Sequence, residues 1–245
     1  MKISKSAKEK TKEKILLCAV DLIIEKGFKN ASLREIAKNA GVSNPTIYNY
    51  FPSKEKLLYA YVEMIHHKSV DVLEGIEDFH TYTLREQLQT LVETELEFYL
   101  EDREFITQIS EMVFHSSSLK LNDIYETKEK FIEVVEEMIN IAIEAGEIKE
   151  MAFKGYLPQL FWDYYIAVVA YWVKDESEGF ENTTQFIDHS MGLIESVLHS
   201  DILDKASSLG SFLFKTHLLS AIERYSAPKK GMDIIKRKLG EAFRG

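Results

Sequence analysis

Apolar residues recur every three or four positions along most of the chain, which is the spacing that places them on one face of an α-helix. Only four Pro and eleven Gly occur among the 245 residues, and no long turn-rich run interrupts the pattern. The pattern therefore predicts an all-α protein of roughly ten helices. The expected helices cover about residues 11–26, 32–40, 43–51, 53–73, 83–100, 102–114, 122–145, 155–174 and 182–199, with further helical segments at 201–225 and 232–243.

Some of these helices carry explicit start signals. Ser32 and Glu35 have the spacing of a capping box, in which each side chain bonds the backbone N–H of the other residue. Thr83 and Glu86 repeat this spacing further along the chain. Ser53 is expected to cap the helix that follows it, because its hydroxyl can accept a hydrogen bond from the first turn.

Residues 32–57 combine two short helices with a tight turn between them. Gly41 is the expected stop of the first helix, because glycine tolerates the left-handed conformation common at a helix C-terminus. Ser43 can cap the second helix, and Pro45 falls in its first turn, where a missing N–H is tolerated. This order of elements is the layout of a helix-turn-helix that binds DNA. The apolar face of the first helix consists of Leu33, Ile36, Ala37 and Ala40.

The second of these helices has a surface suited to DNA. No acidic residue that would repel phosphate occurs from Ser43 to Phe51. Ile47 and Phe51 are four positions apart and can face the core, which leaves five side chains to face outward or to flank: Asn44, Thr46, Tyr48, Asn49 and Tyr50. An Asn can read an adenine edge, and a Thr methyl can meet a thymine methyl. Tyr48 and Lys54 are expected to contact phosphates, which position the protein without reading sequence.

At these residues the chain closely resembles the DNA-binding domain of TetR-type transcriptional regulators. The resemblance covers about residues 11–65 and rests on five stretches in fixed register: Ser32–Ala37, Ala40–Ser43, Thr46–Tyr48, Tyr50–Phe51 and Lys54–Leu57. It implies DNA contacts from Ser32, Arg34, Ser43, Asn44, Pro45, Thr46, Tyr48, Asn49, Tyr50 and Lys54. Ala31 departs from the family pattern, where Thr is frequent. Asn44-Pro45 replaces a Lys-Gly or Lys-Ala type pair, which alters the tip that enters the groove.

Charge is distributed unevenly between the two ends of the chain. Residues 1–60 hold 12 Lys and Arg against six Asp and Glu, whereas residues 61–245 hold 18 against 34. A basic head on an acidic body fits a DNA-facing head, because attraction to phosphate acts locally. The N-terminal lysines fit either an arm that reaches neighbouring phosphates or a solvated, frayed terminus. They are Lys2, Lys5, Lys8, Lys10, Lys12 and Lys14.

The helix expected at 155–174 is apolar on nearly every face, so it must be buried on all sides. The body is small, and we expect a second subunit to supply part of that burial. The resemblance implies a homodimer joined by a four-helix bundle, with two such helices from each subunit. The alternative is a purely internal core. The expected interface consists of Phe161, Tyr164, Val168, Trp172, Phe186, Ser190, Leu193, Ile194 and Val197.

The body also holds candidates for an effector site. Aromatic walls with a few polar groups would suit an apolar or amphipathic small molecule, although each aromatic residue also fits an ordinary core. The candidates are Phe98, Phe105, Gln108, His115, Trp162, Asp163 and Tyr165. Asp163 stands out among them, because an isolated buried carboxylate needs a partner. His66 and His67 are adjacent, so they point in different directions on a helix and form a poor metal pair. We expect no cofactor and no metal.

Three segments are expected: a helix-turn-helix DNA-binding domain with a basic N-terminal arm at 1–52, a helical effector-binding and dimerisation domain at 53–200, and a C-terminal helical extension at 201–245. The extension exceeds the usual family length and is expected to cover the bundle or to buttress the dimer. Its basic segment at 232–243 fits a solvated face packed on the body, or a contact with membrane or nucleic acid. Cys18 is the only cysteine and fits a small buried side chain.

The function predicted from the sequence is a homodimeric, ligand-responsive repressor of a pseudo-palindromic double-stranded DNA operator. An activator is also compatible with the sequence. The rival from another class is a non-DNA-binding, lipid-binding or scaffolding protein on the same fold. An enzyme is not expected, because the sequence lacks a Gly-x-Ser-x-Gly elbow, a phosphate-binding Gly loop and a His-Glu-x-x-His motif. The N-terminus lacks an apolar signal segment and no apolar stretch could span a bilayer, so we expect a cytoplasmic protein without membrane contact.

Overall fold

The computed structural model describes residues 5–115, 125–151 and 154–202, together with residues 205, 208, 209 and 212. These residues form helices and contain no strand, which confirms the all-α class. The helices are α1 (Lys5–Lys26), α2 (Leu33–Asn39), α3 (Asn44–Tyr50), α4 (Lys54–Glu74), α5 (Leu84–Leu100), α6 (Arg103–His115), α7 (Tyr125–Glu144), α8 (Leu157–Trp172) and α9 (Glu181–Leu198). The connections include the 3₁₀ helices η1 (Phe79–Thr81), η3 (Lys154–Tyr156) and η4 (Glu178–Phe180).

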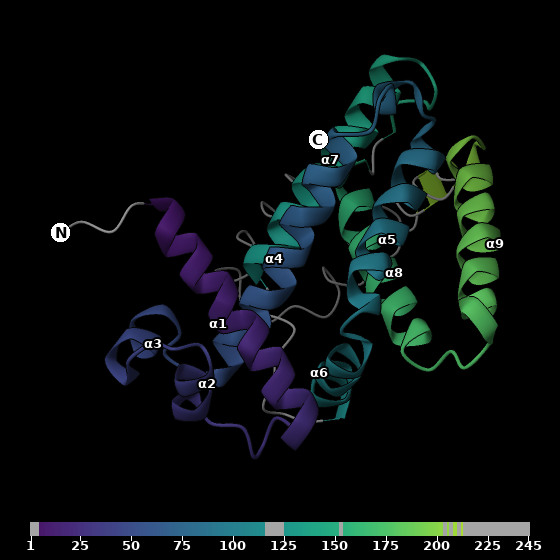
Figure 1. The fold of residues 1–245 in the computed structure, drawn as a ribbon. Coiled ribbons are helices and arrows are strands. Elements are labelled where there is room, and N and C mark those ends of the chain that lie inside the picture. Colours follow the sequence, from purple (N-terminus) through teal and green to yellow (C-terminus); the bar gives the residue numbers. More distant parts are fainter. Residues whose placement is uncertain are drawn as a thin grey trace, which may run out of the picture.

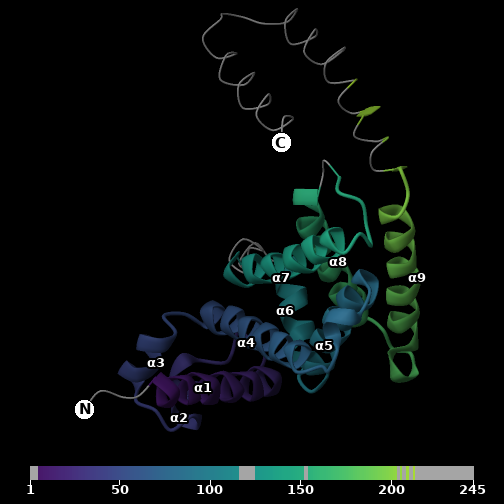
Figure 2. The same cartoon turned by 90° about the horizontal axis from the view of Figure 1, so that it is seen from above.

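Helix α4 joins a small head to a larger body. Helices α1, α2 and α3 gather into the head, and α5 to α9 form the body, with α9 on its outer side (Figures 1 and 2). Helix α4 packs against α1 in the head and against α5 and α7 in the body. Helix α8 packs against both α7 and α9. None of the described helices is long and apolar enough to cross a membrane.

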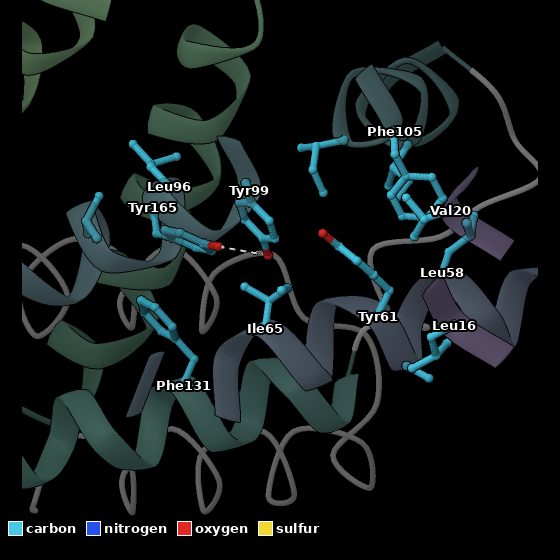
Figure 3. Close-up of a cluster of buried hydrophobic side chains, with 14 of the residues drawn as sticks. Leu16, Val20, Leu58, Tyr61, Ile65, Leu96, Tyr99, Phe105, Phe131 and Tyr165 are labelled. Atoms are coloured by element: carbon cyan, nitrogen blue, oxygen red, sulfur yellow. Dashed lines mark hydrogen bonds between the residues drawn. The ribbon is translucent and has the colours of Figure 1, made fainter. Parts of the chain in front are cut away.

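One buried apolar cluster runs through both the head and the body. It includes Leu16 and Val20 of α1, Leu58 of α4 and Phe105 of α6, which lie together at the junction (Figure 3). The same cluster continues to Met191 of α9. Helix α1 also packs directly on α6, so the head touches the body at two places. One continuous set of packed side chains therefore joins the head to the body.

The start signals expected from the sequence are confirmed. The Ser32 hydroxyl accepts from the backbone N–H of Glu35 at 3.3 Å, and the Glu35 carboxylate accepts from the backbone N–H of Ser32 at 3.2 Å. Thr83 and Glu86 form the same reciprocal pair at the start of α5. Ser53 caps α4 by accepting from the backbone N–H of Lys56. These polar groups fix where each helix begins.

The N-terminal helix is longer than expected. It begins at Lys5 rather than near residue 11, so the lysines from Lys5 to Lys14 lie on a helix, and their role as an arm that reaches neighbouring phosphates stays a prediction. Lys12 forms an ion pair with Glu63 of α4 at 3.6 Å. The start of the helix expected at 122 and most of the extension at 201–245, including the basic segment at 232–243, lie outside the described residues. Cys18 is half-buried against the core.

We expect Thr83→Ala to lower the free energy of unfolding by about 1 kcal/mol, because it removes the side-chain cap of α5. The Thr83 hydroxyl donates to the Glu86 carboxylate at 2.8 Å and accepts from the Glu86 backbone N–H at 3.2 Å. Thr90→Ala is the matched control, because Thr90 lies inside the same helix and bonds only the Glu86 carbonyl. Urea unfolding measures both variants; equal loss of stability in the two would contradict the capping role.

Candidate nucleic-acid interface and body core

The helix-turn-helix is held together by a small apolar core. Ile36 and Ala37 of α2 and Ile47 of α3 are fully buried. Between the two helices Gly41 has a φ of 66°, in the left-handed region that glycine adopts without strain. The backbone N–H of Val42 then donates to the Ala37 carbonyl at 2.9 Å, which closes the end of α2. The position of α3 is therefore set by α2 and not by contacts of its own outer face.

The outer face of α3 is polar, and it carries no acidic residue. Thr46 is half-buried, and its hydroxyl lies 2.8 Å from that of Ser43, which caps the helix. Tyr50 is half-buried beside Phe51, with the ring centroids 6.3 Å apart. The exposed side chains are Asn44, Pro45, Tyr48 and Asn49. Of the ten residues expected to contact DNA, six are exposed: these four together with Ser43 and Arg34.

Two further expected DNA contacts come from α2 and its cap. Arg34 is exposed near the start of α2. Ser32 is half-buried, and its hydroxyl donates to the Glu35 carboxylate at 2.8 Å within the capping box. Glu35 also forms an ion pair with Lys26 at 3.0 Å. Arg34 is therefore the freer of the two for a phosphate, and both residues stay predictions.

Lys54 has a structural role that the sequence did not indicate. Its ammonium group donates to the carbonyls of Phe28, Lys29 and Ala31, the last at 2.7 Å. The same group lies over the Phe28 ring, 4.5 Å from its centroid. Three carbonyls take the three protons of the ammonium, so Lys54 ties the α1–α2 loop to the start of α4. These bonds occupy the ammonium within the head, and the expected contact of Lys54 with a DNA phosphate stays a prediction.

A polar cluster that the sequence reasoning missed lies in the body core. His66 of α4 and Glu95 of α5 are 2% and 1% exposed, and His66 Nδ1 lies 2.6 Å from Glu95 Oε1. The Tyr165 hydroxyl of α8 donates to Glu95 Oε2 at 2.9 Å and lies 3.3 Å from the Tyr99 hydroxyl (Figure 3). Burial and the neighbouring Glu95 raise the pKa of both Tyr99 and Tyr165, so their hydroxyls stay protonated.

The position of this cluster could have been found from helical spacing. His66 follows Leu58 by eight positions, which places the two side chains on one face of α4. Glu95 lies four positions from both Leu91 and Tyr99 on α5. Both polar residues therefore interrupt an apolar stripe. Within the described residues, no group of three or more His, Cys, Asp or Glu is placed to hold a metal ion.

The residues expected to line an effector site separate into different environments. Phe105, Trp162 and Tyr165 are buried, while Phe98 and Gln108 are half-buried. Trp162 and Tyr165 pack around the Phe131 ring, whereas Phe105 lies at the other end of the cluster against Tyr61 (Figure 3). Asp163 is exposed and accepts from Gln159 at 3.0 Å, which corrects the expectation of a carboxylate in apolar surroundings. The His115 side chain lies outside the described part of the structure.

The residues expected at a dimer interface also divide between the core and the surface. Phe161, Val168 and Trp172 are buried inside the protomer, so they are corrected to core residues. The outward stripe of α8 consists of Tyr164, which is one of the expected residues, together with Leu160, Ala167 and Tyr171. On α9, Phe186, Ser190, Ile194 and Val197 are half-buried, and Leu193 is 66% exposed. Tyr171 stacks on Phe186 with ring centroids 5.0 Å apart, which joins the two helices into one apolar surface.

Comparisons with known proteins agree with this architecture. Residues 15–61 match the model of bacterial regulatory proteins of the tetR family, and residues 87–213 match that of the tetracyclin repressor-like C-terminal domain. The fatty acid metabolism regulator protein of Bacillus subtilis (strain 168) is 25% identical over 167 residues, which cover 67% of this chain and 84% of that protein.

Two solved structures share the fold. One is a putative TetR-family transcriptional regulator from Syntrophomonas wolfei, with a TM-score of 0.62 and 20% identity over 77% of this chain and 96% of that chain. The other is the transcriptional regulator FadR from Bacillus subtilis in complex with stearoyl-CoA, with a TM-score of 0.56 and 24% identity over 78% of this chain and 98% of that chain. The match to the tetracyclin repressor-like C-terminal domain alone spans more than half of the sequence. This chain belongs to the TetR family of transcriptional regulators.

Proposed function

We propose that the protein is a homodimeric repressor that binds a pseudo-palindromic operator through α3 and releases it when an acyl-chain effector enters the body. This proposal rests on which side chains of α3 are buried and which are exposed. Ile47 anchors the helix in the head, while Asn44, Tyr48 and Asn49 are exposed on a face without acidic residues. Such a helix fits the major groove, where an Asn can bond an adenine edge with two hydrogen bonds.

A dimer is supported by the apolar surface of α8 and α9. Leu160 and Leu193 are 60% and 66% exposed, which is unusual for large apolar side chains on one continuous surface. A symmetric contact through this surface would bury it and place two copies of α3 on one face of the assembly. Two such helices read half-sites about 34 Å apart, one turn of DNA.

The class of effector is inferred from a relative and from the core. The similar protein of Bacillus subtilis is a regulator of fatty acid metabolism. The body core of this chain is rich in aromatic side chains around Phe131, with a polar cluster at its edge. Apolar walls with a few placed polar groups suit a molecule with a long acyl chain and one polar end. An acyl-CoA or a fatty acid has this chemistry.

Ion pairs on both sides of α4 support the proposal that a shift of the body helices moves the head. On the head side, Lys68 of α4 pairs with Glu13 of α1 at 2.8 Å. On the body side, Lys130 of α7 pairs with Glu63 of α4 at 2.6 Å, and the same Glu63 meets Lys12 of α1. An effector that shifts α7 or α8 therefore moves α4 and α1 together. It lowers operator affinity only by the difference in its affinity for the two conformations.

Selection of bound fragments from the source genome with the purified full chain tests this proposal. We expect a short palindrome, a footprint of two half-sites, and release of that DNA by stearoyl-CoA but not by CoA. The reason is that only the acyl-bearing molecule can occupy the apolar core. Absence of any enriched fragment at low salt would contradict the repressor and favour a protein that binds lipid or partners without DNA.

We expect Asn49→Ala to change the preference at one base position of each half-site by about 1–3 kcal/mol, because a bidentate contact to one base would be lost. Asn140→Ala is the control, since Asn140 lies on α7 in the body. Binding to a set of operators with single-base changes measures the preference. A uniform loss on every operator would remove Asn49 from base reading.

We expect Leu193→Glu to convert the dimer into a monomer and to reduce operator affinity at least tenfold. The reason is that the substitution places a charge in the centre of the proposed interface. Ile141→Glu is the matched control, because Ile141 is a large apolar residue on α7 that is 48% exposed. Light scattering after size-exclusion chromatography gives the mass of each variant. A Leu193→Glu variant that stays dimeric would place the interface elsewhere.

A further inference from the structure

The loop between α1 and α2 satisfies part of its own backbone. Gly27 follows the last residue of α1, and the backbone N–H groups of Asn30 and Ala31 both donate to its carbonyl at 3.2 Å. Ala31 is 2% exposed, so the end of the loop is packed into the core of the head. The loop thus pairs these donors internally, and its other carbonyl groups need a donor from elsewhere.

One ammonium group supplies those donors. Lys54 Nζ donates to the carbonyls of Phe28, Lys29 and Ala31, at 3.3 Å for Lys29 and 2.7 Å for Ala31. The same ammonium lies 4.5 Å from the centroid of the Phe28 ring. An ammonium has three protons, and hydrogen bonds from a charged donor are stronger than those between neutral groups. The conformation of the loop therefore depends on Lys54 in the protein without DNA.

These bonds are one of two direct ties between the helix-turn-helix and α4. The first tie is the chain itself, which passes from the end of α3 to the start of α4 through Phe51, Pro52 and Ser53. The second is Lys54, which lies in the first turn of α4 and holds the loop that leads to Ser32, the cap of α2. One tie lies at the end of α3 and the other at the start of α2, so together they define the orientation of the helix pair.

The remaining contacts between α2 and α4 are indirect. Helix α2 packs against α1 and α3 and makes little direct contact with α4. Helix α1 packs on both α2 and α4, but apolar packing of this kind is non-directional. Hydrogen bonds have preferred distances and angles, so the bonds of Lys54 restrict the orientation of α2 more narrowly than the packing does.

We propose that Lys54 is a positioning residue for operator binding: it fixes the start of α2 to the start of α4 and so sets the angle at which α3 meets the groove. This inference rests on the proposed function and adds the side chain through which a movement of α4 reaches the recognition helix. Because Lys54 lies in the first turn of α4, a displacement of that turn carries the loop and α2 with it. In this role Lys54 acts without touching DNA, whereas the contact predicted from the sequence is with a phosphate.

Lys54→Met tests the assignment, because methionine keeps an unbranched stem beside Phe28 and removes the ammonium. In the protein without DNA, we expect hydrogen exchange at the amides of Asn30 and Ala31 to become about tenfold faster, since their bonds to Gly27 require an ordered loop. We expect operator affinity to fall about tenfold, because a head at the wrong angle loses base contacts. Affinity for random-sequence DNA should stay within about twofold of the control, because attraction to phosphate does not depend on that angle.

Lys56→Met is the matched control for charge. Lys56 is exposed in the same turn of α4, and its ammonium lies 5.6 Å from the centroid of the Tyr59 ring. This variant removes the same charge from the same place, so its effect on both DNAs measures the loss of electrostatic attraction alone. Thr83→Ala is the control for stability, since it removes a helix cap in the body. It should leave the ratio of operator to random-DNA affinity unchanged.

Lys54→Arg distinguishes the two roles of Lys54 if Lys54→Met does not fold. Arginine keeps the charge and can bind a phosphate through two parallel hydrogen bonds, but its planar donors do not converge on three carbonyls as an ammonium does. We expect Lys54→Arg to lose operator affinity relative to random DNA, and to exchange faster at Asn30 and Ala31.

Three results would overturn the positioning role. They are wild-type operator affinity or better in Lys54→Arg, an equal loss on both DNAs in Lys54→Met, and unchanged exchange at Asn30 and Ala31 in either variant. A wild-type protein that binds no DNA at low salt would overturn the proposed function itself, and this outcome is recognised without either variant.

Discussion

Helix α4 packs in the core of the head and in the core of the body, and the position of the head relative to the body depends on this shared helix. It buries Leu57 and Leu58 near its start, where α1 packs, and Ile65 and Leu73 further along, where α5 and α7 pack. A helix of 21 residues is about 32 Å long, at about 1.5 Å per residue. A tilt of about 5° at one end therefore displaces the other by about 3 Å. Small changes among the body helices are thus enlarged at α3.

Buried polar contacts fix the angle and register of α4. Tyr61 donates to Asp102 at 2.6 Å, and His66 meets Glu95 five residues later. A buried polar contact contributes little net stability, because the loss of hydration offsets most of the attraction. These contacts do make a displacement of α4 unfavourable in free energy, since one shift of the helix would leave several polar groups without hydrogen-bond partners. These contacts therefore favour a small number of discrete positions for α4.

The sequence predicted the class of fold and the helix-turn-helix, because local signals specify both. Capping residues, the glycine at 41 and apolar spacing act within a few residues of each other, and the structure reproduces them. Asp163 and Val168 were misplaced because a helix that is apolar all round has no pattern that tells its inner face from its outer one. The bonds of Lys54 within the head were missed because its partners lie in a loop more than twenty residues away. Only tertiary contacts carry that information.

The ammonium of Lys54 is held by carbonyls inside the head, and while it keeps these bonds it does not displace a condensed cation from DNA. Each phosphate contact adds about 0.9 to the slope of log affinity against log salt concentration. A dimer without this contact on either subunit would have a slope lower by about 1.8 than a count of basic residues suggests. Operator recognition would then rely more on groove contacts than on counterion release. Such a regulator would discriminate its site over a wider range of ionic strength.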